Sequence, residues 1–169
     1  MEFIMSEMQK IGIFVDVQNI YYTTKKVFHQ HFDYNELWRL VTTDKQVVIA
    51  NAYAIASHQD KQRQFHNILR GIGFDVKLKP FITRADGSAK GDWDVGITID
   101  VMEHAKLCDR VYLLSGDGDF ELLVAKLQDD FKVPVTVIAT QNVTATKLVQ
   151  TADEFIAIDH QLLLSKKKY

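Results

Sequence analysis

The stretch LLSGDGDFELL, residues 113–123, joins the end of one apolar run to the start of another through a turn that holds two aspartates between glycines. A short apolar run of this kind indicates a strand that is buried on both faces. Asp117 and Asp119 therefore stand where a buried strand ends and a helix begins. Ligands of open parallel sheets bind at this position, beyond the carboxyl ends of the strands.

Apolar runs recur along the chain and alternate with stretches of helical pattern. The runs predict strands at 11–15, 47–56, 74–82, 111–115, 133–139 and 154–159, the last at an edge of the sheet. The helical stretches are at about 20–30, 34–42, 59–71, 93–107, 119–129 and 144–151. This alternation indicates an α/β fold with a mainly parallel sheet that is covered by helices. Residues 83–92 form a long polar segment without such a pattern, and loops of this length are often functional.

Composition and charge favour one globular domain. The chain has 169 residues, of which 47% are hydrophobic and 25% charged, and its formal net charge is -2. A near-neutral chain carries no global positive field that would indicate nucleic acid binding, although a local basic face remains compatible with it. The single cysteine, Cys108, excludes an internal disulfide and a thiolate-rich zinc site. Without a basic, apolar leader or an 18-residue apolar stretch, we expect a cytoplasmic protein outside the membrane.

Three segments that are distant in sequence are expected to bring carboxylates to one crevice. Asp16 ends the apolar run 11–15, and Asp117 and Asp119 follow the run 111–115. If these two strands are neighbours in the sheet, both carboxyl ends face the same crevice. On a helix over 93–107, Asp94 falls in the middle of the apolar stripe, so it is expected to point inward, whereas Asp100 lies on the flank.

Gathering these aspartates has an electrostatic cost. Two like charges about 4 Å apart repel by about 4 kcal/mol at an effective dielectric of 20. A raised pKa on one carboxylate offsets the repulsion of one charge. A hard divalent cation, Mg²⁺ or Mn²⁺, offsets it for all of them, and carboxylate oxygens are the ligands that such ions prefer.

Taken together, three motifs resemble the NYN domain, in particular its LabA-like branch within the PIN-like nuclease superfamily. The motifs are FVDVQNIYY (14–22), KGDWDVGITIDVM (90–102) and LLSGDGDFELL (113–123), and ATKLVQTADEFIAID (145–159) resembles the closing helix and strand of that family. The resemblance covers about residues 10–159, which leaves an N-terminal extension, 1–9, and a basic C-terminal tail, 160–169. It implies a three-layer α/β/α fold that is PIN-like and Rossmannoid.

The resemblance also implies an activity and a set of site residues. It implies a ribonuclease that hydrolyses RNA, expected to be single-stranded, with a water activated by Mg²⁺ or Mn²⁺. Its metal ligands would be Asp16, Asp94, Asp117 and Asp119, which are also catalytic residues together with Asn19. The residues expected to bind the substrate are Asn19, Arg84, Lys90 and Ser115. The spacing after Lys90 is one residue longer than the family pattern, so Asp92 is an alternative to Asp94, although the helix geometry favours Asp94.

Each of these residues has a structural alternative. Aspartates at strand-to-helix junctions often cap the helix, which applies to Asp16 and Asp119 and is the favoured role for Asp92. The aromatic residues near the motifs pack in cores more often than they stack on bases; they are Tyr21, Tyr22, Phe81 and Trp93. Lys77 and Lys79 fit the outward positions of an edge strand as well as an RNA contact.

Three other functions remain open from the sequence. The main alternative is a non-catalytic RNA- or nucleotide-binding regulatory module that retains the metal pocket. A phosphatase or phosphotransferase on a similar sheet is a further alternative, which a covalent aspartyl-phosphate would reveal. Self-association into a homo-oligomer through an exposed helix is compatible with all of them.

Overall fold

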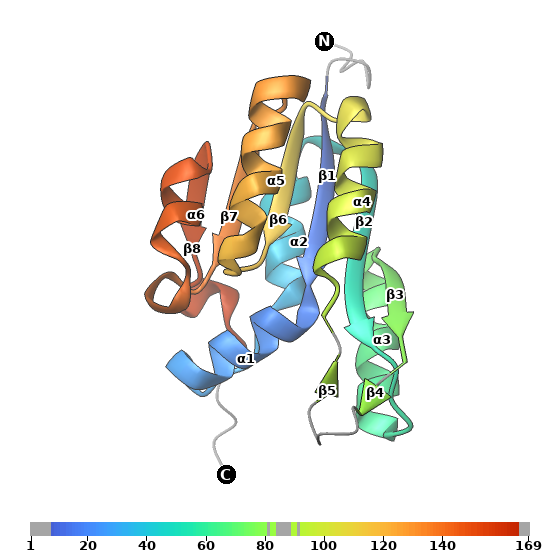
Figure 1. Cartoon of the computed structure of the whole chain (residues 1–169). Coiled ribbons are helices and arrows are strands. Elements are labelled where there is room, and N and C mark those ends of the chain that lie inside the picture. The colour runs from blue at the N-terminus through green and yellow to red at the C-terminus, as the bar shows by residue number, and fades with distance from the viewer. Residues whose placement is uncertain (1–7, 81, 84–88, 91, 166–169) are drawn as a thin grey trace.

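A six-stranded parallel sheet forms the centre of the molecule (Figure 1). The computed structural model describes residues 8–80, 82–83, 89–90 and 92–165. Every neighbouring pair in the sheet is parallel, and the strand order is β3-β2-β1-β6-β7-β8. The strands are β1 (Gln9–Asp16), β2 (Lys45–Ile55), β3 (Asp75–Lys79), β6 (Arg110–Leu114), β7 (Val135–Ala139) and β8 (Glu154–Ala157).

Helices cover both faces of this sheet. They are α1 (Val17–Phe28), α2 (Tyr34–Thr42), α3 (Asp60–Ile72), α4 (Asp94–His104), α5 (Glu121–Lys126) and α6 (Thr146–Thr151). Buried residues of α1, α2 and α3 share one core with Ile13 and Val15 of β1. Residues of α4, α5 and α6 share a second core with Phe14. Successive residues of β1 point into opposite cores, which explains why its sequence is one apolar run. The helices on both faces of the sheet confirm the expected three-layer α/β/α fold.

The strand order reverses between β1 and β6. These two strands pair directly, with Val15 opposite Leu114, although 97 residues of chain lie between Asp16 and Leu114. The expectation that the strands preceding Asp16 and Asp117 are neighbours is confirmed. Their carboxyl ends form the crevice at which ligands bind in sheets of this topology.

The strand expected at 74–82 is shorter than predicted. β3 ends at Lys79, and Pro80 has no N–H with which to continue the ladder. Beyond it, β4 (Ile82–Thr83) pairs antiparallel with β5 (Ala89–Lys90) in a separate two-stranded sheet. The polar segment 83–92 therefore contains the last residue of β4 and both residues of β5, and residues 84–88 and 91 lie outside the described part of the chain.

Two helices differ from their predicted extent for local reasons. α1 begins at Val17 rather than near residue 20, because the Asp16 carboxylate accepts the N–H of Asn19 at 3.4 Å and caps the helix. The helix expected at 119–129 is composite: a 3₁₀ turn (Gly118–Phe120) precedes α5, and a π-helical turn (Leu127–Phe131) follows it. The other predicted helices agree with the structure to within three residues at their ends.

In the part of the chain that the structure describes, no helix has both the length and the apolar character that a membrane span requires.

We expect the substitution Gly73→Ala to destabilise the protein by about 2–4 kcal/mol. Gly73 ends α3 with φ 140°, and a Cβ there would lie 2.6 Å from two ring carbons of Trp38. Gly71→Ala is the matched control, because a Cβ at this helical position meets nothing within 4 Å. It should stabilise the fold by about 0.5–1 kcal/mol. Urea unfolding of both variants measures the difference, and equal midpoints would contradict this account.

Candidate metal centre

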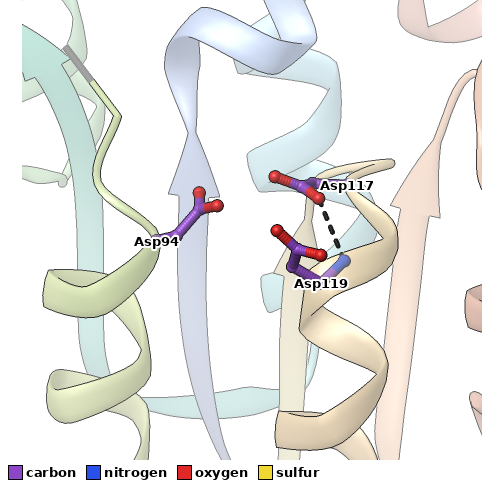
Figure 2. Close-up of side chains that lie close together, drawn as sticks. All are labelled: Asp94, Asp117 and Asp119. Atoms are coloured by element: carbon purple, nitrogen blue, oxygen red, sulfur yellow. Dashed lines mark hydrogen bonds between the residues drawn. The ribbon is translucent and has the colours of Figure 1, made fainter. Parts of the chain in front are cut away.

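Three carboxylates from two chain segments meet at the carboxyl edge of the sheet. Asp94 is the first residue of α4, and Asp117 and Asp119 belong to the turn between β6 and α5. One oxygen from each side chain lies within 4.8 Å of the other two. Figure 2 shows Asp94 projecting from the start of its helix toward the two aspartates of the turn. Asp94 and Asp117 are half-buried, whereas Asp119 is exposed.

The turn is held by its own aspartate. The carboxylate of Asp117 accepts the backbone N–H of Asp119 at 3.0 Å, the contact drawn as a dashed line in Figure 2. Asp117 thereby caps the 3₁₀ turn, while one of its oxygens remains directed at the group of three. The alternative that Asp119 caps the next helix is wrong, since Phe120 occupies the N-cap of α5 and no side chain bonds there.

The glycines of the turn are required by the protein's own packing. A Cβ on Gly116 would lie 2.7 Å from Oγ1 of Thr144, and a Cβ on Gly118 would lie 2.8 Å from Cβ of Ala145. The N–H of Ala145 also bonds the carbonyl of Gly116 at 3.3 Å. These glycines therefore permit the close approach of the segment before α6.

Asp16, the fourth predicted metal ligand, is not part of the group of three, and its carboxylate accepts hydrogen bonds from the protein itself. It is buried, and its carboxylate accepts the hydroxyl of Ser115 at 3.0 Å and the N–H of Asn19. The Ser115 hydroxyl in turn accepts the N–H of Asp117 at 3.2 Å. This chain of hydrogen bonds links the end of β1 to the aspartate turn, so Asp16 both caps α1 and positions Asp117.

The predicted contact between Ser115 and a substrate is not supported. Its side chain is 0% exposed, and its hydroxyl is occupied on both sides by the contacts to Asp16 and Asp117. Ser115 therefore has a positioning role, which is to link Asp16 to the aspartate turn.

Asn19 joins the two segments at the crevice. Its side-chain oxygen accepts the N–H of Gly116 at 2.9 Å. Among the described residues, the Nδ2 amide of Asn19 has no hydrogen-bond acceptor, so this donor is free for a phosphate oxygen. The predicted place of Asn19 next to the site agrees with the geometry, and the structure adds a second role, which is to hold the turn.

Burial and neighbouring negative charges raise the pKa values of two carboxylates in this centre. Burial, a hydrogen bond with Asp117 and the negative charges of Asp117, Asp16 and Asp92 raise the pKa of Asp94 to about 7. Burial is also the main reason why the pKa of Asp16 is raised, while the bonds from Ser115 and Asn19 act in the opposite direction. The crevice therefore concentrates more negative charge than the protein alone compensates.

The donors fit a hard divalent ion. Oxygens bound to one octahedral Mg²⁺ lie about 3–4 Å apart, as the 2.0–2.1 Å bond length requires. Three carboxylate oxygens within 4.8 Å of one another reach this spacing with small side-chain rotations. All three donors are carboxylates, which suit Mg²⁺ or Mn²⁺ rather than a soft metal. The charge imbalance at Asp94 provides the electrostatic reason for an ion to bind.

Asp92 and Asp94 have different positions. The side chain of Asp92 is exposed, and its backbone carbonyl accepts Nζ of Lys79 at 3.0 Å. The predicted capping by Asp92 is wrong, because Trp93 is the N-cap of α4 and no side chain bonds there. Of the two alternatives for the acidic position, it is Asp94 that joins the group of three.

Asp100 has a role that the sequence did not reveal. Its carboxylate accepts the hydroxyl of Tyr53 at 2.8 Å, and the buried Asn51 donates to the same hydroxyl at 3.1 Å. At the start of the helix, Nε1 of Trp93 donates to the carbonyl of Ala54 at 2.8 Å. These bonds attach α4 to β2 at two places and thus fix the direction in which Asp94 points. The polar residues Asn51 and Tyr53 inside the apolar run 47–56 could have indicated a buried hydrogen-bond partner.

Some of the remaining aromatic and basic residues named in the sequence analysis pack inside the protein, and others are exposed on its surface. Trp93 packs on Tyr53 with ring centroids 5.2 Å apart, and Nζ of Lys79 lies 4.6 Å from its ring centre. Tyr21 and Tyr22 are 37% and 58% exposed. Lys77 forms an ion pair at 3.1 Å with Asp75 on the edge strand. Arg84 and Phe81 lie outside the described residues, and the structure describes only the backbone of Lys90.

Comparison with known proteins relates this chain to a family, to a curated protein and to a solved structure. The family model described as NYN domain matches residues 10–159. The Low amplitude and bright protein LabA of Synechococcus elongatus is 27% identical over 158 residues, which are 89% of this chain and 84% of that protein. A crystal structure of a protein of unknown function from Vibrio parahaemolyticus is 54% identical, with a TM-score of 0.90, over 97% of this chain and 100% of the other.

In metal-free protein, we expect Asp94→Asn to raise the free energy of unfolding at pH 8 by about 1 kcal/mol, because partial exposure screens much of the repulsion. The folded pKa of about 7 exceeds the reference value of 3.8. The folded state therefore binds more protons between these values, and stability is lost as the pH rises through 7. The gain in the variant should accordingly shrink at pH 5.

Urea unfolding in EDTA at both pH values measures this effect. Asp129→Asn removes an exposed aspartate of the Leu127–Phe131 turn and is the matched control. A large loss of stability in the metal-free Asp94→Asn protein would contradict the assigned role.

Proposed function

The chain belongs to the NYN domain family and is LabA-like, and on that premise we propose that it is a divalent-metal-dependent ribonuclease. NYN domains are part of the PIN-like nuclease superfamily. The observation that supports the proposal is the meeting of Asp94, Asp117 and Asp119 within 4.8 Å at the reversal of strand order. We propose RNA as the substrate. We propose that it is single-stranded, because the backbone of an unpaired strand can enter a crevice between helix ends.

The metal site is the group of three. Asp94, Asp117 and Asp119 would hold Mg²⁺ or Mn²⁺, and Asp16 would support them through Ser115. When bound, such an ion polarises a phosphate oxygen and lowers the pKa of a water, which allows in-line attack on a phosphodiester.

The remaining steps use the chain's own groups. The Nδ2 donor of Asn19, in the first turn of α1, would bond a phosphate oxygen, and backbone amides at a helix N-terminus also favour an anion. The bond between Asn19 and Gly116 keeps this donor and the aspartate turn in one fixed relation. On this proposal, Asn19 contributes a hydrogen-bond donor for the phosphate and the aspartate turn contributes ligands for the ion. Arg84 and Lys90 stay predicted contacts to the backbone of the substrate.

The range proposed for the catalytic domain is 10–159, with residues 1–9 and 160–169 as extensions that the chemistry does not require. We propose a cytoplasmic location, where RNA is accessible.

We expect purified protein to cleave single-stranded RNA with Mn²⁺ and to lose the activity in EDTA. Asp117→Asn should lower the rate by at least about 100-fold, because it removes a charged ligand from the centre. Asp129→Asn should keep the rate of the unchanged protein, since this aspartate is remote from the crevice. Separation of the labelled products on a denaturing gel measures the cleavage.

The outcome also distinguishes the main alternative. Cleavage by Asp117→Asn at the rate of the unchanged protein would show a contaminating nuclease and contradict the proposal. Binding of RNA without cleavage under all metal conditions would instead favour a regulatory module that retains the metal pocket.

We expect the affinity for Mn²⁺ to depend on pH. The pKa of Asp94 is raised to about 7, so a proton competes with the ion below that pH. The affinity should fall about tenfold per unit below pH 7, as the loss of one proton requires, and become constant above pH 8. Isothermal titration calorimetry in buffers with different ionisation enthalpies measures the affinity and the released proton. An affinity that does not change between pH 6 and 8 would contradict a role for Asp94.

A further inference from the structure

We propose that the exposed face of α1 is a binding track for single-stranded RNA that leads into the metal centre. The track comprises Tyr21, Tyr22, Lys25, Lys26, His29 and His31. The assignment of RNA rests on the proposed function, whereas the location of the track rests on contacts that are independent of the metal centre.

Exposed aromatic rings are the first element of the track. Tyr22 is 58% exposed and Tyr21 is 37% exposed, with ring centroids 5.3 Å apart in an edge-to-face arrangement. Tyr21 also stacks on His31 at 6.0 Å, with 26° between the ring planes. None of these rings belongs to either hydrophobic core. Unpaired bases stack on solvent-exposed aromatic rings of this kind, and such stacking is largely independent of the nucleotide sequence.

Positive charge is the second element. Lys25 and Lys26 occupy the last turn of α1, and both are exposed. Neither lysine forms an ion pair with an acidic side chain in the part of the chain that the structure covers. Nζ of Lys25 lies 5.5 Å from the ring centre of Tyr21, so charge and aromatic surface are presented together. In a chain with a net charge of -2, this combination is a local basic face that fits a phosphate backbone.

A shallow hollow lies between these elements. It has a volume of about 230 Å³ and is lined by Tyr21, Lys25, His29, Gln30 and His31. Its lining combines one aromatic face with donors on several sides. Such a lining fits a base or a phosphate better than an apolar ligand, and an acidic side chain is absent from it.

The track begins at the metal centre. Asp16 caps α1, and Asn19 bonds the aspartate turn from the first turn of the same helix. From Asp16 to His29 the helix rises about 20 Å, at 1.5 Å per residue. In Figure 1, α1 leaves the carboxyl end of β1 and runs along that edge of the sheet. A strand bound to α1 is therefore led from the hollow toward the carboxylates, which lie where the helix begins.

The test measures RNA binding without cleavage. Fluorescence anisotropy follows a labelled 12-nucleotide single-stranded RNA with the full chain in EDTA at low salt. Tyr22→Leu should weaken binding by at least about fivefold, the lower limit for the loss of one stacked base. Lys25→Gln/Lys26→Gln should reduce the slope of log affinity against log salt by about 1.4, since about 0.7 is lost per phosphate contact on a single strand.

Matched controls separate this role from general effects. Tyr22→Phe keeps the ring and should bind as the unchanged protein does. Lys61→Gln/Arg63→Gln removes two exposed charges from α3 and should leave the salt slope unchanged. Circular dichroism melts confirm that each variant is folded.

The outcomes of binding and cleavage are independent of each other. Affinities of Tyr22→Leu and Lys25→Gln/Lys26→Gln equal to that of the unchanged protein would overturn the track, even if the protein cleaves RNA. Equal affinity for duplex and single-stranded RNA would also overturn it. Reduced binding by these variants in a protein that never cleaves would support the track and contradict the ribonuclease proposal.

Discussion

Repulsion among aspartates at the carboxyl edge of the sheet is the constraint to which the surrounding structure is adapted. The reversal of strand order brings the ends of β1 and β6 together, and α4 adds a further carboxylate from the side. Two such charges about 4 Å apart cost about 4 kcal/mol at an effective dielectric of 20. Burial first, and then the hydrogen bond and the charges of the neighbouring aspartates, raise the pKa of Asp94 to about 7. On the proposed function, a divalent cation bound by these carboxylates would offset this cost.

Neutral groups fix the carboxylates of Asp16 and Asp117, which accept hydrogen bonds from a hydroxyl and from backbone amides. Within α4, the carboxylate of Asp100 accepts the Tyr53 hydroxyl. None of these partners carries a positive charge. Hydrogen bonds from neutral donors orient an anion without cancelling its charge, so the attraction for a cation is preserved. A lysine at the same positions would satisfy the carboxylates and remove the site.

The parts of this structure that follow from the sequence are those determined by local periodicity. Apolar runs predicted the strands, and the stripe on α4 predicted that Asp94, rather than Asp92, points inward. Other features depend on contacts between distant segments. The conformation of the aspartate turn depends on Thr144 and Ala145, which leave room only for glycine. For this reason the sequence did not reveal that Asp117, rather than Asp119, is the capping residue. The end of β3 at Lys79 has a local cause, which is Pro80. The apolar pattern of residues 74–82 led us to predict a strand that continues past this proline.

A consequence of the charge distribution concerns the order in which ligands bind. The basic face of α1 attracts a phosphate backbone, whereas three uncompensated carboxylates at the start of the same helix repel it. A divalent ion cancels most of that negative charge and, on the proposed function, changes the crevice from repulsive to attractive for a phosphate. A phosphate in the crevice conversely adds an oxygen ligand to the ion. Because coupling between two ligands is reciprocal, each must then raise the affinity for the other by the same factor. The net charge of -2 conceals this arrangement, since opposite charges at the two ends of α1 cancel in the total.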